Sequence, residues 1–140
     1  MNHEPSFKGV AGIIDEVFEK EELRDFFFEN VPICFLAINE EGVIVDCNKA
    51  FYKGLGYERS EVAGKEWSNF IHPDDLEESI QVANENLVSK TFVKGLGHFD
   101  NRYISKDGSY CLTLRWFEGK ALYFNNFYMA YALIIDQKYD

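Results

Sequence analysis

The residues best suited to chemistry in this 140-residue chain form one short cluster, His72-Pro73-Asp74-Asp75. An imidazole and two carboxylates at this spacing could bind a metal ion. However, proline suits the first position of a helix, and carboxylates in the first turn face the exposed amides at the positive end of the helix dipole. The cluster therefore predicts a helix start better than a metal site, and we assign no metal-binding residue.

Other reactive groups are isolated in the sequence. Cys34, Cys47 and Cys111 lie singly in apolar runs without a Cys-x-x-Cys spacing, which predicts buried free thiols in a reducing compartment. The stretch Gly95-Leu96-Gly97 lacks the third glycine and the strand-to-helix context of a phosphate-binding loop. Because no nucleophile and base stand in a recognisable pattern, we assign no catalytic residue and do not expect an enzyme.

Composition and charge exclude further classes of function. The formal net charge is -10 and no Lys/Arg cluster is evident, which argues against nucleic acid and anionic membranes as partners. No apolar run approaches the ~18 residues of a membrane helix, so direct membrane insertion is not expected. The start of the chain lacks the basic and apolar regions of a signal peptide. We expect a soluble, cytoplasmic protein or a soluble piece of a larger one.

Hydrophobic periodicity predicts the elements that must position any functional side chain. An amphipathic helix, or two short ones, is expected over Ile13–Asn30. Helices are also expected after Asn48, around Glu61 and from Pro73 onward. Strands are expected at Cys34–Ile38, Val43–Cys47, His98–Ile104, Tyr110–Phe117 and Phe127–Asp136. Grouped strands around one helical block favour an α+β fold with a five-stranded antiparallel sheet. We divide the chain into a segment 1–23 and a domain 24–140.

Four motifs, taken in order, resemble the PAS domain, a sensory module. The resemblance covers roughly residues 24–136. The first motif is Gly42…Asn48-x-Ala50-Phe51…Gly56-Tyr57…Glu61…Gly64-Lys65, and the second is Ile71–Asp75. The third is Phe99-x-x-Arg102-Tyr103-x-x-Lys106-Asp107-Gly108-Ser109, and the fourth is Ile134-Ile135-Asp136. Members often end in Asp-Ile-Thr, whereas Gln137 and Lys138 follow Asp136 here. The resemblance implies helices on one face of the sheet.

The resemblance also bears on cofactors. Flavin photosensors of this family carry a reactive cysteine where this chain has Trp67, and an indole cannot form the flavin thioether. A flavin bound without a covalent bond and used for redox chemistry remains as a weaker alternative. Haem-binding members take a histidine from the long helix, but none occurs between Leu76 and Lys90, so haem is not expected. The identity of any cofactor stays open.

Candidate ligand-binding residues follow from the family register. When the later strands are aligned with those of the family, alternate residues are expected to point toward the helices. A buried arginine there would either hold an anionic ligand or pair with an internal carboxylate, unless the register is wrong by one residue. The candidates are Trp67, Asn69, Phe70, Asn101, Tyr103, Thr113, Arg115 and Ala132.

The opposite sheet face is predicted to be apolar and covered by the N-terminal helix of a homodimer. Its candidate interface residues are Val17, Phe18, Phe27, Leu114, Trp116 and Leu133. The function that the resemblance implies is a ligand-binding sensory domain that regulates an attached output domain, such as a histidine kinase of a two-component system. The alternative is a ligand-free module for dimerisation or protein interaction.

Overall fold

The computed structural model describes residues 21–85, 98–117, 122–124 and 126–139. The chain divides into two compact units, Met1–Val31 and Pro32–Asp140. In the first unit, helix α2 spans Glu21–Asn30, within the predicted amphipathic segment. The interface candidates Val17 and Phe18 lie outside the described residues, as does the side chain of Phe27. The predicted boundary at residue 24 stays a prediction.

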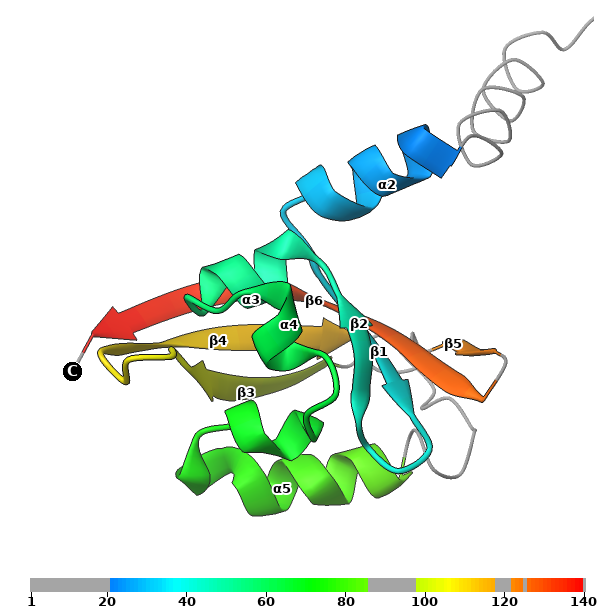
Figure 1. Ribbon diagram of the computed structural model, residues 1–140. Helices are drawn as coiled ribbons and strands as arrows, with labels where there is room; N and C mark the ends of the chain where they lie inside the picture. Colours follow the sequence, from blue (N-terminus) through cyan, green and yellow to red (C-terminus); the bar gives the residue numbers. More distant parts are fainter. Residues whose placement is uncertain (1–20, 86–97, 118–121, 125, 140) are drawn as a thin grey trace, which may run out of the picture. The chain divides into compact units, whose positions relative to one another are not determined.

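The second unit holds two strands, a block of short helices and further strands (Figure 1). None of the helices in the described ranges has the length and apolar character needed to span a bilayer. The elements are β1 Cys34–Asn39, β2 Ile44–Cys47, α3 Lys49–Gly54, α4 Arg59–Val62, the 3-10 helix η1 Trp67–Phe70, α5 Pro73–Ala83, β3 His98–Ile104, β4 Tyr110–Phe117, β5 Leu122–Phe124 and β6 Phe127–Tyr139.

The sheet confirms the predicted antiparallel architecture. Its strand order is β2-β1-β6-β4-β3, and every pairing is antiparallel. A short additional strand, β5, pairs with the start of β6 and was not predicted. The last strand also runs three residues past its predicted end at Asp136. Helices α3, α4 and α5 lie on one face of this sheet in Figure 1.

The Asp-Gly turn joins β3 to β4 as predicted, but with a different turn geometry. Only Gly108 has a positive φ, of 77°, so the turn does not have the two positive-φ residues of the expected hairpin type. The Gly108 amide donates to the Ser105 carbonyl, and Asp107 Oδ1 accepts from the Ser109 amide at 2.9 Å. The carboxylate thus stabilises the turn directly, which explains an aspartate at this position.

Asn48 connects the first hairpin to the helical block. It stands at the N-cap position of α3, where asparagine often caps a helix, but its side chain makes no capping bond. Its Oδ1 accepts from the Phe35 amide at 2.9 Å, and its Nδ2 donates to the Ile33 carbonyl at 2.8 Å. Because Asn48 is fully buried, these bonds satisfy both polar atoms of its side chain and connect the start of α3 to the start of β1.

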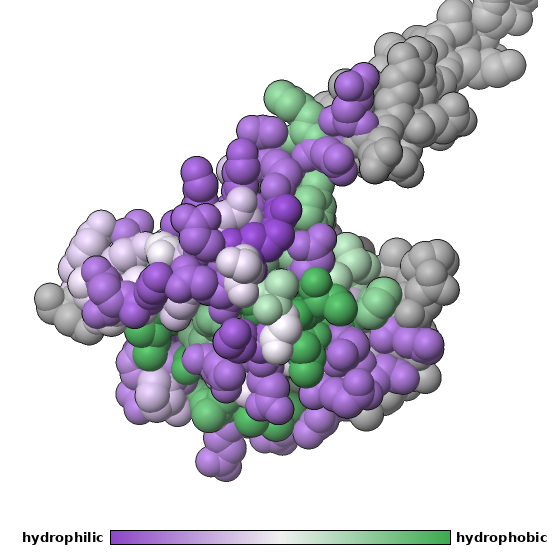
Figure 2. Space-filling view, in the orientation of Figure 1, coloured by the Kyte–Doolittle hydropathy of each residue, from purple (hydrophilic) through white to green (hydrophobic). Residues whose placement is uncertain are grey.

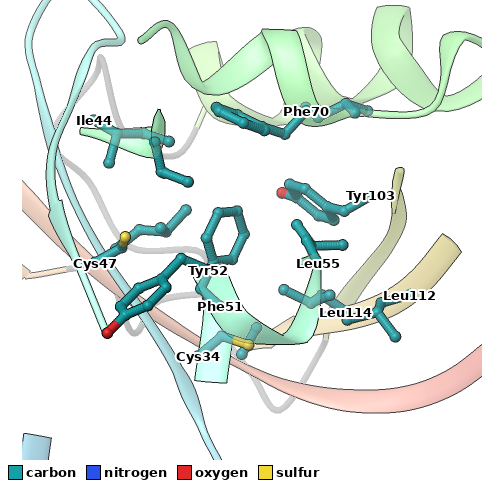
Figure 3. Close-up of a cluster of buried hydrophobic side chains, with 14 of the residues drawn as sticks. Cys34, Ile44, Cys47, Phe51, Tyr52, Leu55, Phe70, Tyr103, Leu112 and Leu114 are labelled. Carbon is teal, nitrogen blue, oxygen red and sulfur yellow. The ribbon is translucent and has the colours of Figure 1, made fainter. Parts of the chain in front are cut away.

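The hydrophobic core lies between the sheet and the helices (Figure 3). Phe51 of α3 meets Phe70 and Tyr103 edge to face, with ring centroids 6.1 and 5.7 Å apart. Cys34 and Cys47 are buried in the same cluster, and all three cysteines of the chain are free thiols. Burial raises the pKa of the Cys34 thiol to about 12, with a smaller contribution from Cys47, so this thiol is unreactive at neutral pH.

The predicted register of β4 is wrong by one residue. Leu112 and Leu114 are buried and point toward α3 in Figure 3. They pair with Tyr103 and Asn101 of β3, and residues directly opposite each other share a face. Thr113 and Arg115 therefore lie on the outer face. Apolar burial decides the register, because a shift by one residue would expose both leucines.

The same correction moves two predicted interface residues. Leu114 is fully buried and Trp116 packs against the core, so neither is available on the outer face. Leu133 pairs with Arg115 and is 37% exposed, consistent with its expected place on the outer face. The outer face is therefore less apolar than the sequence suggested, and the role of Leu133 in an interface stays a prediction.

Candidate functional site

A buried hydrogen-bond network occupies the space between the sheet and the helices. The hydroxyl oxygen of Tyr103 accepts from Trp67 Nε1 at 3.0 Å and from Asn101 Nδ2 at 3.1 Å. Tyr103 has no exposed surface, and its desolvation raises the pKa of the hydroxyl well above the ordinary value. The phenol is therefore neutral at physiological pH and serves as an acceptor for two buried N–H groups.

Asn101 is the centre of this network. Its Oδ1 accepts from Trp116 Nε1 at 2.9 Å, and its Nδ2 also donates to Ser79 Oγ at 3.1 Å. Ser79 Oγ in turn donates to the Asp75 carbonyl at 2.6 Å. The side chains from η1, α5, β3 and β4 are thus joined by mutually satisfied polar groups, an arrangement that specifies one packing of these elements.

A cavity of about 240 Å³ lies at one end of this network. Trp67 belongs to both features, because its ring lines the cavity while its Nε1 donates to Tyr103. The cavity is enclosed by the β1–β2 hairpin, the start of η1, the end of α5 and the start of β6. The lining residues are Ile38, Asn39, Glu40, Glu41, Gly42, Glu66, Trp67, Ser68, Ile80, Ala83, Asn84 and Tyr128.

The lining is apolar on the inside and acidic at its rim. Glu40, Glu41 and Glu66 contribute carboxylates, and the described lining holds no lysine or arginine. Figure 2 shows a mostly hydrophilic surface, with hydrophobic side chains gathered near the middle, next to β2. The carboxylates of Glu41 and Glu66 favour a small uncharged or cationic molecule over an anion at this rim.

Helix α5 presents a different face to the core than its periodicity predicted. The spacing of Leu76, Ile80, Ala83 and Leu87 predicts one buried stripe, but Ile80 is 41% exposed and lines the cavity. Ser79 is buried instead, with its hydroxyl between Asn101 and the helix backbone. Leu76 packs against the core as the stripe predicts, and the position beside Ile80 is buried with its hydroxyl hydrogen-bonded.

Arg115 forms an ion pair on the outer face of the sheet. Its Nε and the terminal nitrogen Nη2 donate to the two carboxylate oxygens of Asp100, each at 2.9 Å. Asp100 stands directly opposite Arg115 in the β3–β4 ladder. Two of the alternatives left open by the sequence are therefore correct. Arg115 pairs with an internal carboxylate, and the predicted register was wrong by one residue, so Arg115 does not reach the cavity.

A second bidentate pair joins the start of α5 to β3. Asp75 accepts from Arg102 Nε at 2.9 Å, from Nη2 at 2.7 Å and from the Arg102 amide at 2.8 Å. These bonds to Arg102 hold the pKa of the Asp75 carboxyl below its ordinary value. At the helix start, His72 Nδ1 accepts from the Asp74 amide at 3.1 Å, as the capping prediction requires.

The pKa shifts at Asp75 and Asp100 predict a loss of stability in acid. Both carboxyls have a lowered pKa when folded, mainly through hydrogen bonds from arginine. Their contribution to the folding stability is complete above the carboxyl pKa of the unfolded chain, about 3.9. It is lost as the pH falls through the lower pKa values of the folded protein. Urea midpoints should therefore stay level from neutral pH to about pH 5 and fall below about pH 4.

Substitution of one carboxyl tests this assignment. Asp75→Asn should lower the midpoint at neutral pH and flatten the drop in acid, while Asp74→Asn should reproduce the wild-type pH profile. Asp74 suits as a control because its side chain is 77% exposed and its closest ion-pair contact, to His72, is 4.0 Å long. Equal profiles for the two variants would contradict the role of the Asp75–Arg102 pair.

A family model described as the PAS fold matches residues 44–126, more than half of the chain. The chain is a PAS domain. The match covers the helical block, the buried network and half of the residues that line the cavity. It confirms the family that the four sequence motifs indicated.

Solved structures of PAS domains share the fold at low sequence identity. The PAS domain of an HTR-like protein from Haloarcula marismortui is 24% identical, with a TM-score of 0.65 over 89% of this chain and 99% of that one. A domain of a sensory box sensor histidine kinase/response regulator from Geobacter sulfurreducens is 16% identical, with a TM-score of 0.62 over 83% and 95%.

A third structure carries a ligand. The PAS domain of the RpfR quorum-sensing receptor from Cronobacter turicensis, in complex with BDSF, is 13% identical, with a TM-score of 0.58 over 77% of this chain and 98% of that one. No curated protein matches the chain. At these identities the solved structures establish the fold alone.

The predicted ligand-binding residues of this PAS domain fall into three groups. Trp67 lines the cavity, and Asn101 and Tyr103 lie directly behind it in the network. Phe70 and Ala132 are buried in the core, while Asn69 is exposed. The remaining two, Thr113 and Arg115, lie on the outer face, and their predicted inward orientation is wrong.

Several residues that line the cavity were not predicted. Ile38 and Tyr128 come from paired positions of β1 and β6, and Ile80 comes from α5. The sequence carries a signal for the first two, since both are apolar residues next to a predicted turn. No sequence pattern indicates that the β1–β2 hairpin and the end of α5 enclose one space. In the described part of the chain, no cluster of His, Cys, Asp and Glu could hold a metal ion.

Proposed function

We propose that this PAS domain is a sensory and regulatory module that binds a small ligand between the sheet and the helices and relays the signal to an attached output domain. The cavity of about 240 Å³ beside Trp67 is the observation that carries the proposal. A concave, partly apolar site with a few polar groups is the usual form of a small-molecule site. A histidine kinase is the kind of output that we expect, as in the protein from Geobacter sulfurreducens.

The proposed ligand is a small metabolite that is neutral or positively charged. Its apolar part would contact Trp67, Ile80 and Tyr128, and its polar part would lie toward the acidic rim. The related receptor domain has been solved with C12:0 as well as with BDSF. Glu41 and Glu66 at the rim would repel a carboxylate, so we do not propose a carboxylate ligand for this chain.

The network behind the cavity offers a physical route for the signal. A ligand that moves the Trp67 ring would alter its hydrogen bond to Tyr103 and, through Asn101, the bond to Trp116 on β4. Strand β4 pairs with β6, which leads to the C-terminus. The ligand would have to bind one arrangement of this network more tightly than another in order to shift the equilibrium.

The proposal includes a homodimer in the cytoplasm and no catalytic activity of the domain itself. The three free cysteines fit a reducing compartment. The alternative function, a ligand-free module for dimerisation or protein interaction, is favoured by the network itself, which fills the space behind Trp67 with satisfied polar groups.

Native mass spectrometry, absorbance from the near ultraviolet to the visible and a thermal-shift panel of metabolites together test ligand binding. A bound compound, or a metabolite that raises the melting temperature by several degrees, is the expected result, since a ligand at 100 times its Kd adds about 2.7 kcal/mol. Ala83→Phe should fill the cavity and remove the shift, whereas Glu77→Phe, at an exposed position of α5, should retain it. A protein without bound mass and without any shift would favour the interaction module.

A further inference from the structure

The second half of β6 pairs with a strand on one side only. Among the residues between 32 and 140 that the structure describes, no strand pairs with its other edge. Strand β1 pairs with β6 only as far as Ala132, whereas β4 follows the opposite edge to Tyr139. None of the backbone-to-backbone hydrogen bonds outside the ladders involves residues 133–139, and the Gln137 amide donates to the neighbouring Asp136 Oδ1 at 2.9 Å. The segment also exposes Ile135 and Tyr139, at 41% and 71%. An edge of this kind can accept another strand.

The charges on this edge are complementary to a second copy of the same edge. When two copies pair antiparallel about Gln137, Asp136 of each copy lies opposite Lys138 of the other. A register centred on Asp136 would place two aspartates opposite each other. A register centred on Ile135 would place neither Asp136 nor Lys138 opposite a charged residue. Opposite charges that face each other across two strands are favourable, so the charges select one register.

We propose that two copies of this chain associate through the β6 edges at residues 135–139, in antiparallel register about Gln137, to form one continuous sheet. The twofold symmetry makes both Asp136–Lys138 pairs equivalent, as an isologous interface requires. Within one chain the two side chains already lie on the same face, 3.9 Å apart. A lysine alone would block edge pairing, but the aspartate at the symmetric position gives it a partner.

The register begins past the irregular part of the strand. The β4–β6 ladder shifts between Thr113 and Leu114, which leaves Ile135 as the extra residue of β6. Asp136, Gln137 and Lys138 are regularly paired with β4, so their other edge has the spacing that a partner strand needs. The proposal places the interface of the proposed homodimer at the β6 edge rather than on the outer face predicted from the sequence, and it rests on the homodimer proposed above.

Charge reversal in the full 140-residue chain tests the register. Asp136→Lys and Lys138→Asp each place like charges opposite each other twice, so each should raise the dimer dissociation constant about tenfold or more in sedimentation. The double variant restores both opposite pairs and should restore the dimer. Both positions are exposed, and thermal melts will show that folding is retained.

A cysteine cross-link provides an independent measurement. Gln137→Cys places two thiols across the symmetry axis, where opposed Cα atoms lie about 4.5 or 5.5 Å apart, within disulfide range in either case. Mild oxidation should yield a covalent dimer. Glu77→Cys on α5 and the wild type, which retains half-buried Cys111, should not.

The outcomes separate this inference from the proposals on which it rests. A dimer that is insensitive to all three charge variants and does not cross-link at position 137 would overturn the β6 register but leave the homodimer. A monomer at high micromolar concentration would overturn both, while the ligand site would be tested separately by its thermal shift.

Discussion

Leu114→Ala is expected to lower the free energy of unfolding by about 3 kcal/mol, whereas Arg115→Ala, one residue along the same strand, should lower it by about 1 kcal/mol or less. Leu114 is fully buried and lies against the helices in Figure 3, so its truncation leaves a cavity. Arg115 is half-buried on the outer face, and its partner Asp100 would remain partly hydrated after the truncation.

The contrast between these two neighbours tests the register of β4 directly. Urea denaturation of both variants at neutral pH gives the two free energies, and Thr113→Ala serves as a further outer-face control. The family register would have predicted the reverse order, with Arg115 inside and Leu114 on the surface. A larger loss for Arg115→Ala than for Leu114→Ala would therefore contradict the structure.

Asn101→Ala is expected to destabilise the domain by about 3 kcal/mol, because it removes three buried hydrogen bonds, one of them to the Trp116 indole N–H. The Trp116 indole N–H would lose its acceptor, and Tyr103 and Ser79 would each lose a donor. Since Asn101 is 2% exposed, water cannot replace these bonds without entering the core. Equilibrium urea unfolding measures the loss of stability.

Tryptophan spectroscopy adds a local readout to this experiment. The chain has two tryptophans, Trp67 and Trp116, and both belong to the network. Asn101→Ala should therefore change the near-ultraviolet circular dichroism of the folded protein. Asn69→Ala is the matched control, because Asn69 is exposed and should leave both stability and spectrum unchanged. A loss below about 1 kcal/mol for Asn101→Ala would mean that the network is not well satisfied in solution.

Much of the fold was predictable because its signals are local. The Asp-Gly turn, the Pro73 helix start and the alternation of the strands each depend on neighbours in sequence. Alternation also separated the two faces of β4 correctly, with Leu112 and Leu114 on one and Thr113 and Arg115 on the other. The error was in choosing which face pointed inward, where the family register was followed in preference to the burial of the leucines.

The candidate site was predictable only in part. Trp67, Asn101 and Tyr103 were identified by their place in the family motifs, and the structure joins them in one network. Asn48 was singled out as well, but its side chain bonds to β1 rather than to the helix that it precedes. Partners so distant in the chain leave no local pattern.

The sequence by itself determined the family, the order of the elements and the absence of an evident catalytic pattern, because these follow from residue types and short spacings. Only the tertiary structure decided that Arg115 pairs with Asp100, that Ser79 rather than Ile80 faces the core, and that a cavity lies beside Trp67. The physical reason is that burial and hydrogen bonding are properties of the packed chain. They select one strand register and one helix rotation among several that the local sequence pattern favours about equally.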